Sequence, residues 1–206
     1  MIAVIGLTGQ SGSGKSFLSG RFSEKGIPVI DADKISHRVT GTDPDCLNAV
    51  RMAFGASVFD EDGSLSRKKL GTVAFSDPEK LKLLNRTVFP FITREIEAQV
   101  DAAESAGQKL LLLDAPTLYE AGADRLCCFV VAVCAPFELR LKRILERDGL
   151  SREAALLRLS AQNGDAYYGE KADLVLYNDG TKEEFLQKAD ELIGMLIRRF
   201  MLPEIK

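Results

Sequence analysis

The sequence predicts an α/β fold with a mainly parallel, five-stranded sheet, and three observations support this prediction. Short apolar runs bounded by turn residues recur along the chain. Most of the segments between these runs have the apolar spacing of helices. A glycine-rich loop follows the first run, which has the composition of a buried parallel strand. The expected strands cover residues 2–7, 27–30, 110–113, 128–135 and 174–177.

The glycine-rich loop matches the phosphate-binding P-loop pattern G-x-x-x-x-G-K-[ST]. In this pattern the glycines let backbone N–H groups converge on phosphate oxygens, Lys15 brings a cation to the outer phosphates, and Ser16 offers a hydroxyl to Mg²⁺. A helix is expected over 17–22, so strand, loop and helix follow in the required order. The alternative, a chance glycine-serine turn, does not account for this order. The sequence therefore predicts a nucleotide site made by Gly9, Gln10, Ser11, Gly12, Ser13, Gly14, Lys15 and Ser16.

Composition favours one compact domain that has no general attraction to polyanions. The chain has 206 residues, of which 46% are hydrophobic, a formal net charge of −3 and a pI near 5.4. It can bury a large core, and its charge argues against nucleic acid or a membrane surface as a partner. The cysteines, at positions 46, 127, 128 and 134, lack metal-site spacing and are expected to be reduced and mostly buried. No basic leader precedes the first strand, and the apolar stretch 128–137 is too short to cross a bilayer, so a cytoplasmic location is expected.

About eighty residues separate the second and third expected strands, which is too many for a simple crossover connection. We expect an inserted helical subdomain over residues 34–106, within a single domain of residues 1–206. Helices are expected over 46–54, 77–85 and 88–106, a turn over 60–64, and a last helix over 182–201 that packs on the sheet.

Two carboxylates, Asp31 and Asp33, follow the second expected strand. Strand alternation would place both on one side at the carboxyl end of the strand, the edge at which open α/β sheets bind ligands. A carboxylate there can accept the proton of an attacking hydroxyl during phosphoryl transfer. Asp33 is therefore the candidate catalytic base. Alternatively it caps a helix over 34–39, and the two roles are compatible.

The third expected strand ends in Asp114, as a second P-loop motif would. A carboxylate in that position helps to hold Mg²⁺, either directly or through the water shell of the ion. The alternative is a strand-terminal aspartate that only caps the next turn. Ser16 and Asp114 are thus the candidate metal ligands.

Three arginines share one face of a helix that is expected to begin at Phe137. Arg140, Arg143 and Arg147 are spaced i, i+3 and i+7, and guanidinium groups match the geometry of phosphates. We interpret residues 137–166 as a mobile, arginine-bearing lid over the nucleotide. A solvated basic face balanced by neighbouring acids is the alternative.

The inserted segment carries candidate contacts to the acceptor substrate. Arg67 can meet a second anionic group, since a kinase holds two substrates in line. His37, the only histidine, falls one helical turn after Asp33 and within reach of the same ligand. Surface solvation, and a histidine without a catalytic task, are the alternatives.

Taken together and in order, these motifs resemble the dephospho-CoA kinases, which phosphorylate the ribose 3'-hydroxyl of dephospho-CoA with ATP and Mg²⁺. The resemblance spans nearly the whole chain and implies a three-layer P-loop kinase fold. It rests on residues 6–9 ahead of the P-loop, 29–33, 65–70, 73–75, 116–120, 141–148, 161–162, 171–173 and 178–180. In that family the matching aspartate is the base, the lid arginines contact ATP phosphates, and an Asn-x-Gly loop lies beside adenine. These roles fall to Asp33, Arg143, Arg147, Asn178 and Gly180, with Lys15 as a further catalytic cation.

The chain departs from the family pattern in three places. Gln10-Ser11 stands where the family usually has Gly-Ile, at positions that the P-loop pattern leaves free. Phe89-Pro90 stands in place of His-Pro and puts an aromatic surface where the acceptor would meet a polar group. Residues 163–168, after Gln162, are less helical and less basic than in relatives, which bears on lid motion or anchoring.

The predicted function is therefore ATP-dependent phosphorylation of dephospho-CoA, the last step of coenzyme A biosynthesis. Phe89 keeps a second hypothesis open, a P-loop kinase for another small hydroxyl compound such as a nucleoside or nucleotide. A nucleotide switch is disfavoured, because the chain has no Asn-Lys-x-Asp segment that would read guanine. ATP and Mg²⁺ are the expected cofactors, dephospho-CoA is the expected partner, and a monomer or weak homo-oligomer is the expected assembly.

Overall fold

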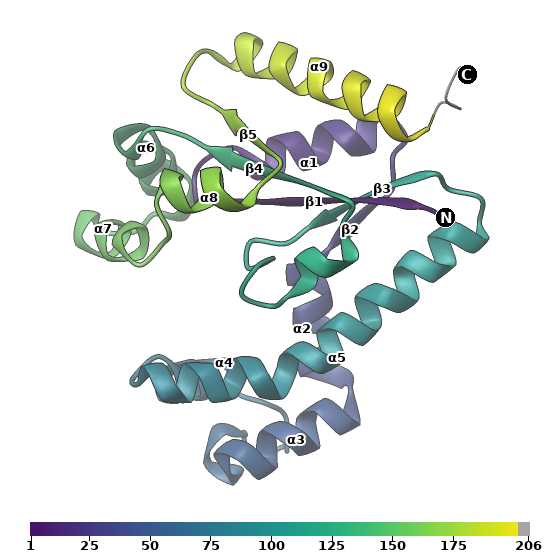
Figure 1. Cartoon of the computed structure of the whole chain (residues 1–206). Coiled ribbons are helices and arrows are strands. Elements are labelled where there is room, and N and C mark those ends of the chain that lie inside the picture. The colour runs from purple at the N-terminus through teal and green to yellow at the C-terminus, as the bar shows by residue number, and fades with distance from the viewer. Residues whose placement is uncertain (202–206) are drawn as a thin grey trace. The chain divides into compact units, whose positions relative to one another are not determined.

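A computed structural model describes residues 1–201, so the predicted domain of residues 1–206 extends beyond the described residues at 202–206. The five predicted strands are all present and form one sheet in the order β2-β3-β1-β4-β5 (Figure 1). The predicted α/β fold with a mainly parallel sheet is confirmed. The strands are β1 (Ala3–Gly9), β2 (Val29–Asp31), β3 (Leu110–Asp114), β4 (Phe129–Cys134) and β5 (Leu174–Tyr177).

Strand β1 lies at the centre of the sheet and pairs in parallel with β3 and β4. Ile5 lies opposite Leu112 on one side, and Leu7 lies opposite Val131 on the other. Strand β5 extends the sheet by pairing in parallel with β4. Parallel strands end at a common edge, where ligands of open α/β sheets bind. The loop that leaves β1 and the aspartate that ends β3 therefore meet at this edge.

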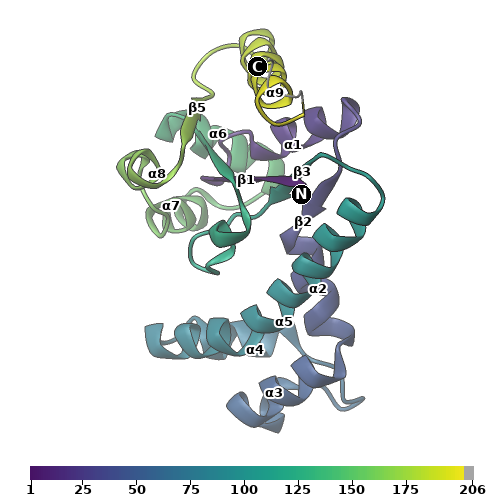
Figure 2. The same cartoon turned by 45° about the vertical axis from the view of Figure 1, so that its right-hand side comes forward.

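Two helices, α1 (Lys15–Glu24) and α9 (Lys182–Phe200), cover one face of the sheet, as Figures 1 and 2 both show. Leu18 and Phe22 of α1 and Leu192 and Leu196 of α9 are buried in one apolar cluster with strand residues. The side chain of Arg21 donates to Asp190 at 2.8 Å and links the two helices at the surface. The prediction that the last helix packs on the sheet is confirmed.

The opposite face of the sheet is covered by residues 115–126 and by α8 (Asp165–Lys171). Segment 115–126 contains the short 3₁₀ helix η2 (Ala123–Leu126), and its Leu118 is fully buried. Tyr168 of α8 packs against Ala132 and Cys134 of β4. Helices α6 (Phe137–Asp148) and α7 (Arg152–Ser160) follow β4 and share a small apolar core of their own, made by Leu141, Ile144, Ala155 and Leu159.

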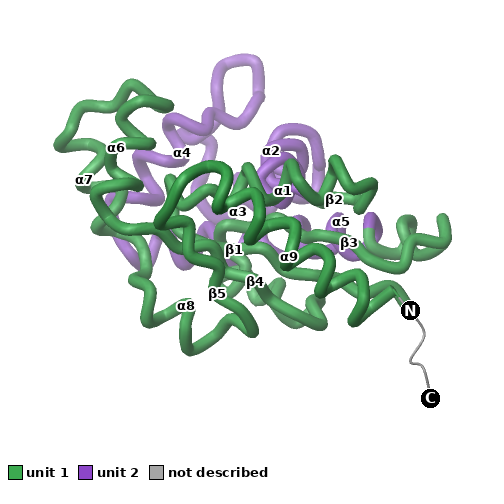
Figure 3. The backbone as a smooth tube through the Cα atoms, turned by 90° about the horizontal axis from the view of Figure 1, so that it is seen from above, with its two compact units in different colours: residues 1–30, 100–206 green, residues 31–99 purple. Residues whose placement is uncertain are grey.

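The chain divides into two compact units, Met1–Ile30 with Val100–Lys206 and Asp31–Gln99 (Figure 3). The second unit is helical. Its elements are α2 (Ala32–Thr42), α3 (Pro44–Phe54), the 3₁₀ helix η1 (Ala56–Val58), α4 (Arg67–Ala74) and most of α5 (Pro78–Ser105). The predicted turn over 60–64 is present, with the Gly63 N–H donating to the Asp60 carbonyl at 2.9 Å.

Helix α5 corrects the prediction of separate helices over 77–85 and 88–106. It runs through Pro90 without a break. Proline removes one helical hydrogen bond and costs about 3 kcal/mol in a helix interior. The helix continues because Val88, Ile92 and Ile96 keep the apolar spacing across the proline and are buried.

The prediction that the cysteines are free and mostly buried holds only in part. All four are free thiols, but only Cys46 and Cys134 are buried, whereas Cys128 is exposed. Within residues 1–201, none of the helices combines the length and the apolar character that crossing a membrane requires.

Candidate functional site

The P-loop presents unused backbone N–H groups to a ligand. The Ser11 N–H donates to the Gln162 Oε1 atom at 3.0 Å, and the Ser13 N–H donates to the Gln10 carbonyl at 3.2 Å. Among the other N–H groups of the loop and of the first turn of α1, those of Gly12, Gly14, Lys15 and Ser16 have no hydrogen-bond partner among the described residues. Successive free N–H groups at a helix N-terminus form an anion-binding nest.

Gly12 and Gly14 are required by the backbone of this nest. Gly12 has a φ of +78° and Gly14 a φ of +106°, and residues with a Cβ atom rarely adopt such values. A Cβ at Gly12 would lie 2.8 Å from the Arg140 carbonyl, and one at Gly14 would lie 2.3 Å from the Asn178 Nδ2 atom. The loop therefore approaches α6 and the end of β5 too closely for any other residue.

Lys15 and Asp114 form an ion pair at the edge of the sheet. Strand pairing explains this contact, since β1 and β3 are neighbours, Asp114 ends β3, and Lys15 follows the loop that leaves β1. Asp114 is buried and accepts from the Lys15 ammonium, and among the described residues it caps no turn, so the capping alternative is wrong. Ser16 lies in the first turn of α1, and its side chain is exposed.

The three arginines of α6 lie in different environments, although they share a helix face. Arg143 donates to the Gly12 carbonyl at 3.2 Å and to the Asn178 Oδ1 atom at 3.2 Å, and its burial lowers the pKa of the guanidinium. Arg140 is buried and donates to the Ala135 carbonyl at 3.0 Å. Arg147 is exposed and paired with Asp148 at 2.6 Å. Of these three guanidinium groups, that of Arg143 donates to the P-loop, whereas Arg140 approaches Gly12 with its backbone.

A pocket of about 300 Å³ opens beside the P-loop, lined by Gly14, Phe17, Arg143, Asn178, Lys182 and Phe185. The rings of Phe17 and Phe185 lie 5.6 Å apart, and Asn178 is tied down by donating to the Ser13 carbonyl at 2.7 Å. An apolar slot with an arginine and an amide at its border suits a flat aromatic base.

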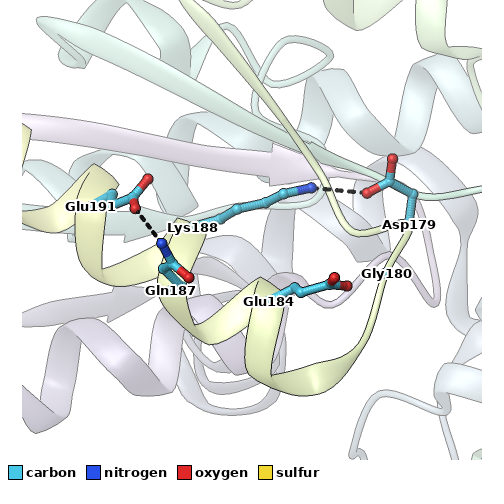
Figure 4. A pocket seen from close by; sticks show the side chains of 6 residues that line it. All are labelled: Asp179, Gly180, Glu184, Gln187, Lys188 and Glu191. Carbon is cyan, nitrogen blue, oxygen red and sulfur yellow. Dashed lines mark hydrogen bonds and ion pairs between the residues drawn. The ribbon is translucent and has the colours of Figure 1, made fainter.

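Gly180 does not line that pocket. It lines a second, acidic pocket of about 440 Å³ at the start of α9, where Asp179 pairs with Lys188 at 2.9 Å and Gln187 with Glu191 at 2.8 Å (Figure 4). Glu184, in the same pocket, accepts from the Thr181 N–H and completes the cap of α9. In this second pocket Glu184 thus serves the start of α9, whereas Gln187 and Glu191 pair along the helix.

Two glutamines, Gln10 and Gln162, make contacts that were not predicted from the sequence. The Gln162 amide holds both the N–H and, at 2.8 Å, the hydroxyl of Ser11. The buried Gln10 amide donates to Asp165 at 2.9 Å and to the Asn163 carbonyl at 3.2 Å. Two of the departures from the family pattern, at 10–11 and 163–168, therefore touch each other. About 150 residues separate the two segments in the sequence, so their common polarity was the one signal that could have indicated this contact.

Asp31 rather than Asp33 caps α2, which corrects the capping alternative. The Asp31 carboxylate accepts from the Lys34 N–H at 3.0 Å, and this bond and the Lys34 ammonium hold the pKa of Asp31 below its usual value. Strand β2 ends at Asp31, so strand alternation does not extend to Asp33. Asp33 is exposed and lies in the first turn of α2.

His37 and Arg67 come together within the helical unit. The Arg67 guanidinium donates to the His37 carbonyl at 2.5 Å and also to the Nδ1 atom of its ring. Both side chains are exposed, so this pair is available to a ligand. Phe89 is half-buried on α5, one residue before Pro90.

Fold and site together define a P-loop phosphotransferase of the small-molecule kinase class. The family model described as dephospho-CoA kinase matches residues 3–184. The dephospho-CoA kinase of Geobacillus kaustophilus is 36% identical over 184 residues, which cover 89% of this chain and 92% of the relative. The enzyme of that name from Oryza sativa subsp. japonica is 36% identical over 92% of this chain and 83% of its own. The chain belongs to the dephospho-CoA kinase family.

Solved structures agree with this assignment. Dephospho-CoA kinase from Campylobacter jejuni is 27% identical, with a TM-score of 0.70 over 95% of this chain and 98% of its own. A shikimate kinase from Acinetobacter baumannii is 18% identical, with a TM-score of 0.56 over 100% of this chain and 97% of its own, a likeness that extends to the fold alone.

Proposed function

We propose specific roles for the residues of this chain in the reaction of its family. As a member of that family the chain is a kinase that uses ATP to phosphorylate dephospho-CoA in coenzyme A biosynthesis. The observation that carries the proposed roles is the group of four N–H groups without a partner in the P-loop, next to the Lys15 ammonium. Arg143 donates to a carbonyl of the same loop. This arrangement is what a transferring polyphosphate requires.

ATP binds through its phosphates to the P-loop, residues Gly9 to Ser16, and through its base to the pocket beside it. The free N–H groups hold the β- and γ-phosphates, and Lys15 leaves Asp114 to meet their charge. Adenine packs against Phe17 and Phe185 in the pocket that they line, with the Asn178–Gly180 segment beside it.

Mg²⁺ is proposed as the metal of this reaction, held by Ser16 and Asp114. No group of three or more acidic, histidine or cysteine side chains within residues 1–201 could cage a metal. The donor set still fits, because Mg²⁺ keeps several waters and takes one or two protein ligands plus phosphate oxygens. When bound, the ion neutralises charge on the β- and γ-phosphates.

Asp33 is proposed as the base that orients the ribose 3'-hydroxyl of dephospho-CoA and accepts its proton. Arg143 and Arg147, on a lid of residues 137–166, offset the charge that develops on the transferring group. His37, Arg67 and Phe89 bind the acceptor within a subdomain of residues 34–106. Positioning of the two substrates supplies most of the rate acceleration.

We also propose that the enzyme works in the cytoplasm as a monomer or weak homo-oligomer, on a small molecule rather than on nucleic acid or membrane. Its charge of −3 and the free state of its thiols support this.

The test is conversion of dephospho-CoA to CoA by the purified protein with Mg·ATP, followed by mass spectrometry. Adenosine, AMP and shikimate are included as competing acceptors. Phosphorylation of dephospho-CoA alone is expected. Preference for another acceptor would contradict the proposed acceptor site, and it would mean that Phe89 has changed the specificity.

A further inference from the structure

The contacts between residues 162–165 and the tip of the P-loop are not explained by any role assigned so far. Gln162, Asn163 and Asp165 hold Gln10 and Ser11 through four hydrogen bonds of 2.8–3.2 Å. We call this set of contacts the clasp. It joins the segment that follows α7 to the loop that follows β1, within one compact unit.

Gln162 uses both ends of its amide on a single residue. Its Oε1 atom accepts from the Ser11 N–H at 3.0 Å, and its Nε2 atom donates to the Ser11 Oγ atom at 2.8 Å. Two bonds of opposite sense fix the backbone and the side chain of Ser11 at once. They also engage the Ser11 N–H, which leaves the N–H groups of Gly12, Gly14, Lys15 and Ser16 for the ligand.

The P-loop needs such a restraint because it is rich in glycine. Gly9, Gly12 and Gly14 all have positive φ values, and glycine loses more conformational freedom on ordering than any other residue. If the loop is already held in its binding conformation, less of the free energy of ATP binding is lost in ordering it.

Gln10 supplies the second point of the clasp. Its side chain is 2% exposed and donates to Asp165, while its carbonyl accepts from the Ser13 N–H at 3.2 Å. The lid is thus attached to the P-loop at both of its ends, because Arg143 of α6 contacts Gly12 and the segment after α7 contacts Gln10 and Ser11.

We propose that Gln162 is a positioning residue that holds the tip of the P-loop, residues 10–13, ready for the phosphates of ATP. The inference rests on the proposed function only in that the P-loop is the ATP site. It assigns Gln162 no contact with ATP and no part in proton transfer.

The test measures the Kd of ATP by titration calorimetry without acceptor, in Gln162→Ala, Ser11→Ala and their combination. Loss of both bonds in Gln162→Ala should raise the Kd roughly ten-fold, and loss of the hydroxyl bond alone in Ser11→Ala about three-fold. The double variant should be no weaker than Gln162→Ala, because the two changes remove the same contact. Gln187→Ala, an exposed glutamine of α9 bonded to Glu191, is the matched control and should bind ATP normally.

Steady-state kinetics and melting temperatures separate positioning from a merely structural role. Gln162→Ala should raise the KM for ATP and leave kcat and the KM for dephospho-CoA within about three-fold of wild type. An unchanged ATP Kd in Gln162→Ala would overturn the proposal, as would strictly additive effects in the double variant. Equal losses for both substrates together with a lowered Tm would also overturn it. Because ATP binding is measured alone, failure of the enzyme to phosphorylate dephospho-CoA would leave this result standing.

Discussion

The candidate residues of the two compact units are held in different ways. Those of the nucleotide site are held by one another: Lys15 is paired with Asp114, Arg143 with the P-loop backbone, and Asn178 with Ser13. Among the residues assigned to the acceptor, Asp33, His37 and Arg67 have exposed side chains, and Arg67 is bonded to His37. A triphosphate is recognised largely by fixed backbone groups, which require a rigid frame. The acceptor substrate is expected to be recognised by side chains, which can do this from an exposed surface. Variants in the two units should therefore separate ATP binding from acceptor use.

The largest effect is expected for Lys15→Ala. Removing this cation should lower kcat by about 10³ to 10⁵, the range that an arginine finger contributes when it stabilises the transition state of phosphoryl transfer. Coupled-enzyme detection of ADP measures the effect. Lys25→Ala, which removes a half-exposed lysine just after the same helix, is the matched control and should retain full activity.

Asp33→Asn should lower kcat by about 10² to 10⁴ and leave the Kd of ATP unchanged, because the shape is kept and the proton acceptor is lost. Single-turnover transfer to dephospho-CoA measures the chemical step. Asp31→Asn is the control, since asparagine caps a helix as well as aspartate does. Near-normal turnover in Asp33→Asn would refute the assigned base, and equal losses in both variants would point to the start of α2 instead.

Arg143→Ala should lower kcat/KM for ATP by about 10² to 10³, because Arg143 already lies against Gly12 and Asn178. Arg147→Ala should cost only about ten-fold, because Arg147 is exposed and must first leave Asp148. The neighbouring Lys142→Ala, an exposed lysine on the same helix, should be silent. Equal losses in the two arginine variants would contradict the difference between their environments.

Arg67→Ala should raise the KM for dephospho-CoA about ten-fold without changing the Kd of ATP, since a charge-assisted contact to an anionic acceptor is lost. Initial rates at varied acceptor concentration measure it. Lys68→Ala, one residue further along α4, serves as the control. A change in ATP affinity instead would mean that the helical unit takes part in nucleotide binding.

Local patterns in the sequence predicted the nucleotide site better than the rest of the molecule. The P-loop glycines, Lys15 and the strand that precedes them are neighbours in sequence, so one pattern encodes them. The contact of Lys15 with Asp114 joins residues 99 positions apart, yet it could be anticipated because Asp114 ends one parallel strand and Lys15 follows the loop after its neighbour. The contact of Gln162 with Ser11 has no such framework, since it lies between two irregular segments.

Predictions about the helical unit were less successful for two physical reasons. Helix α2 begins at Ala32, directly after β2 and two residues earlier than expected, so its cap falls on Asp31 instead of Asp33. The break expected at 86–87 is absent, because the buried apolar residues of α5 continue the helical spacing beyond it. The roles of His37, Arg67 and Phe89 stay predictions.

The smallest effect concerns the link between α1 and α9, which supports the nucleotide unit but touches no substrate. Hydrogen bonds from Arg21 hold the pKa of Asp190 below its usual value of 3.8. A carboxyl with a lowered folded-state pKa contributes stability above its unfolded pKa, and this contribution is lost as the pH falls through the folded value. Asp190→Asn should therefore lower the Tm slightly at pH 7, and the difference from wild type should shrink below about pH 4. Thermal melts between pH 7 and pH 2.5 test this. A difference that stays constant over that range would mean that the ion pair does not link the two helices in solution.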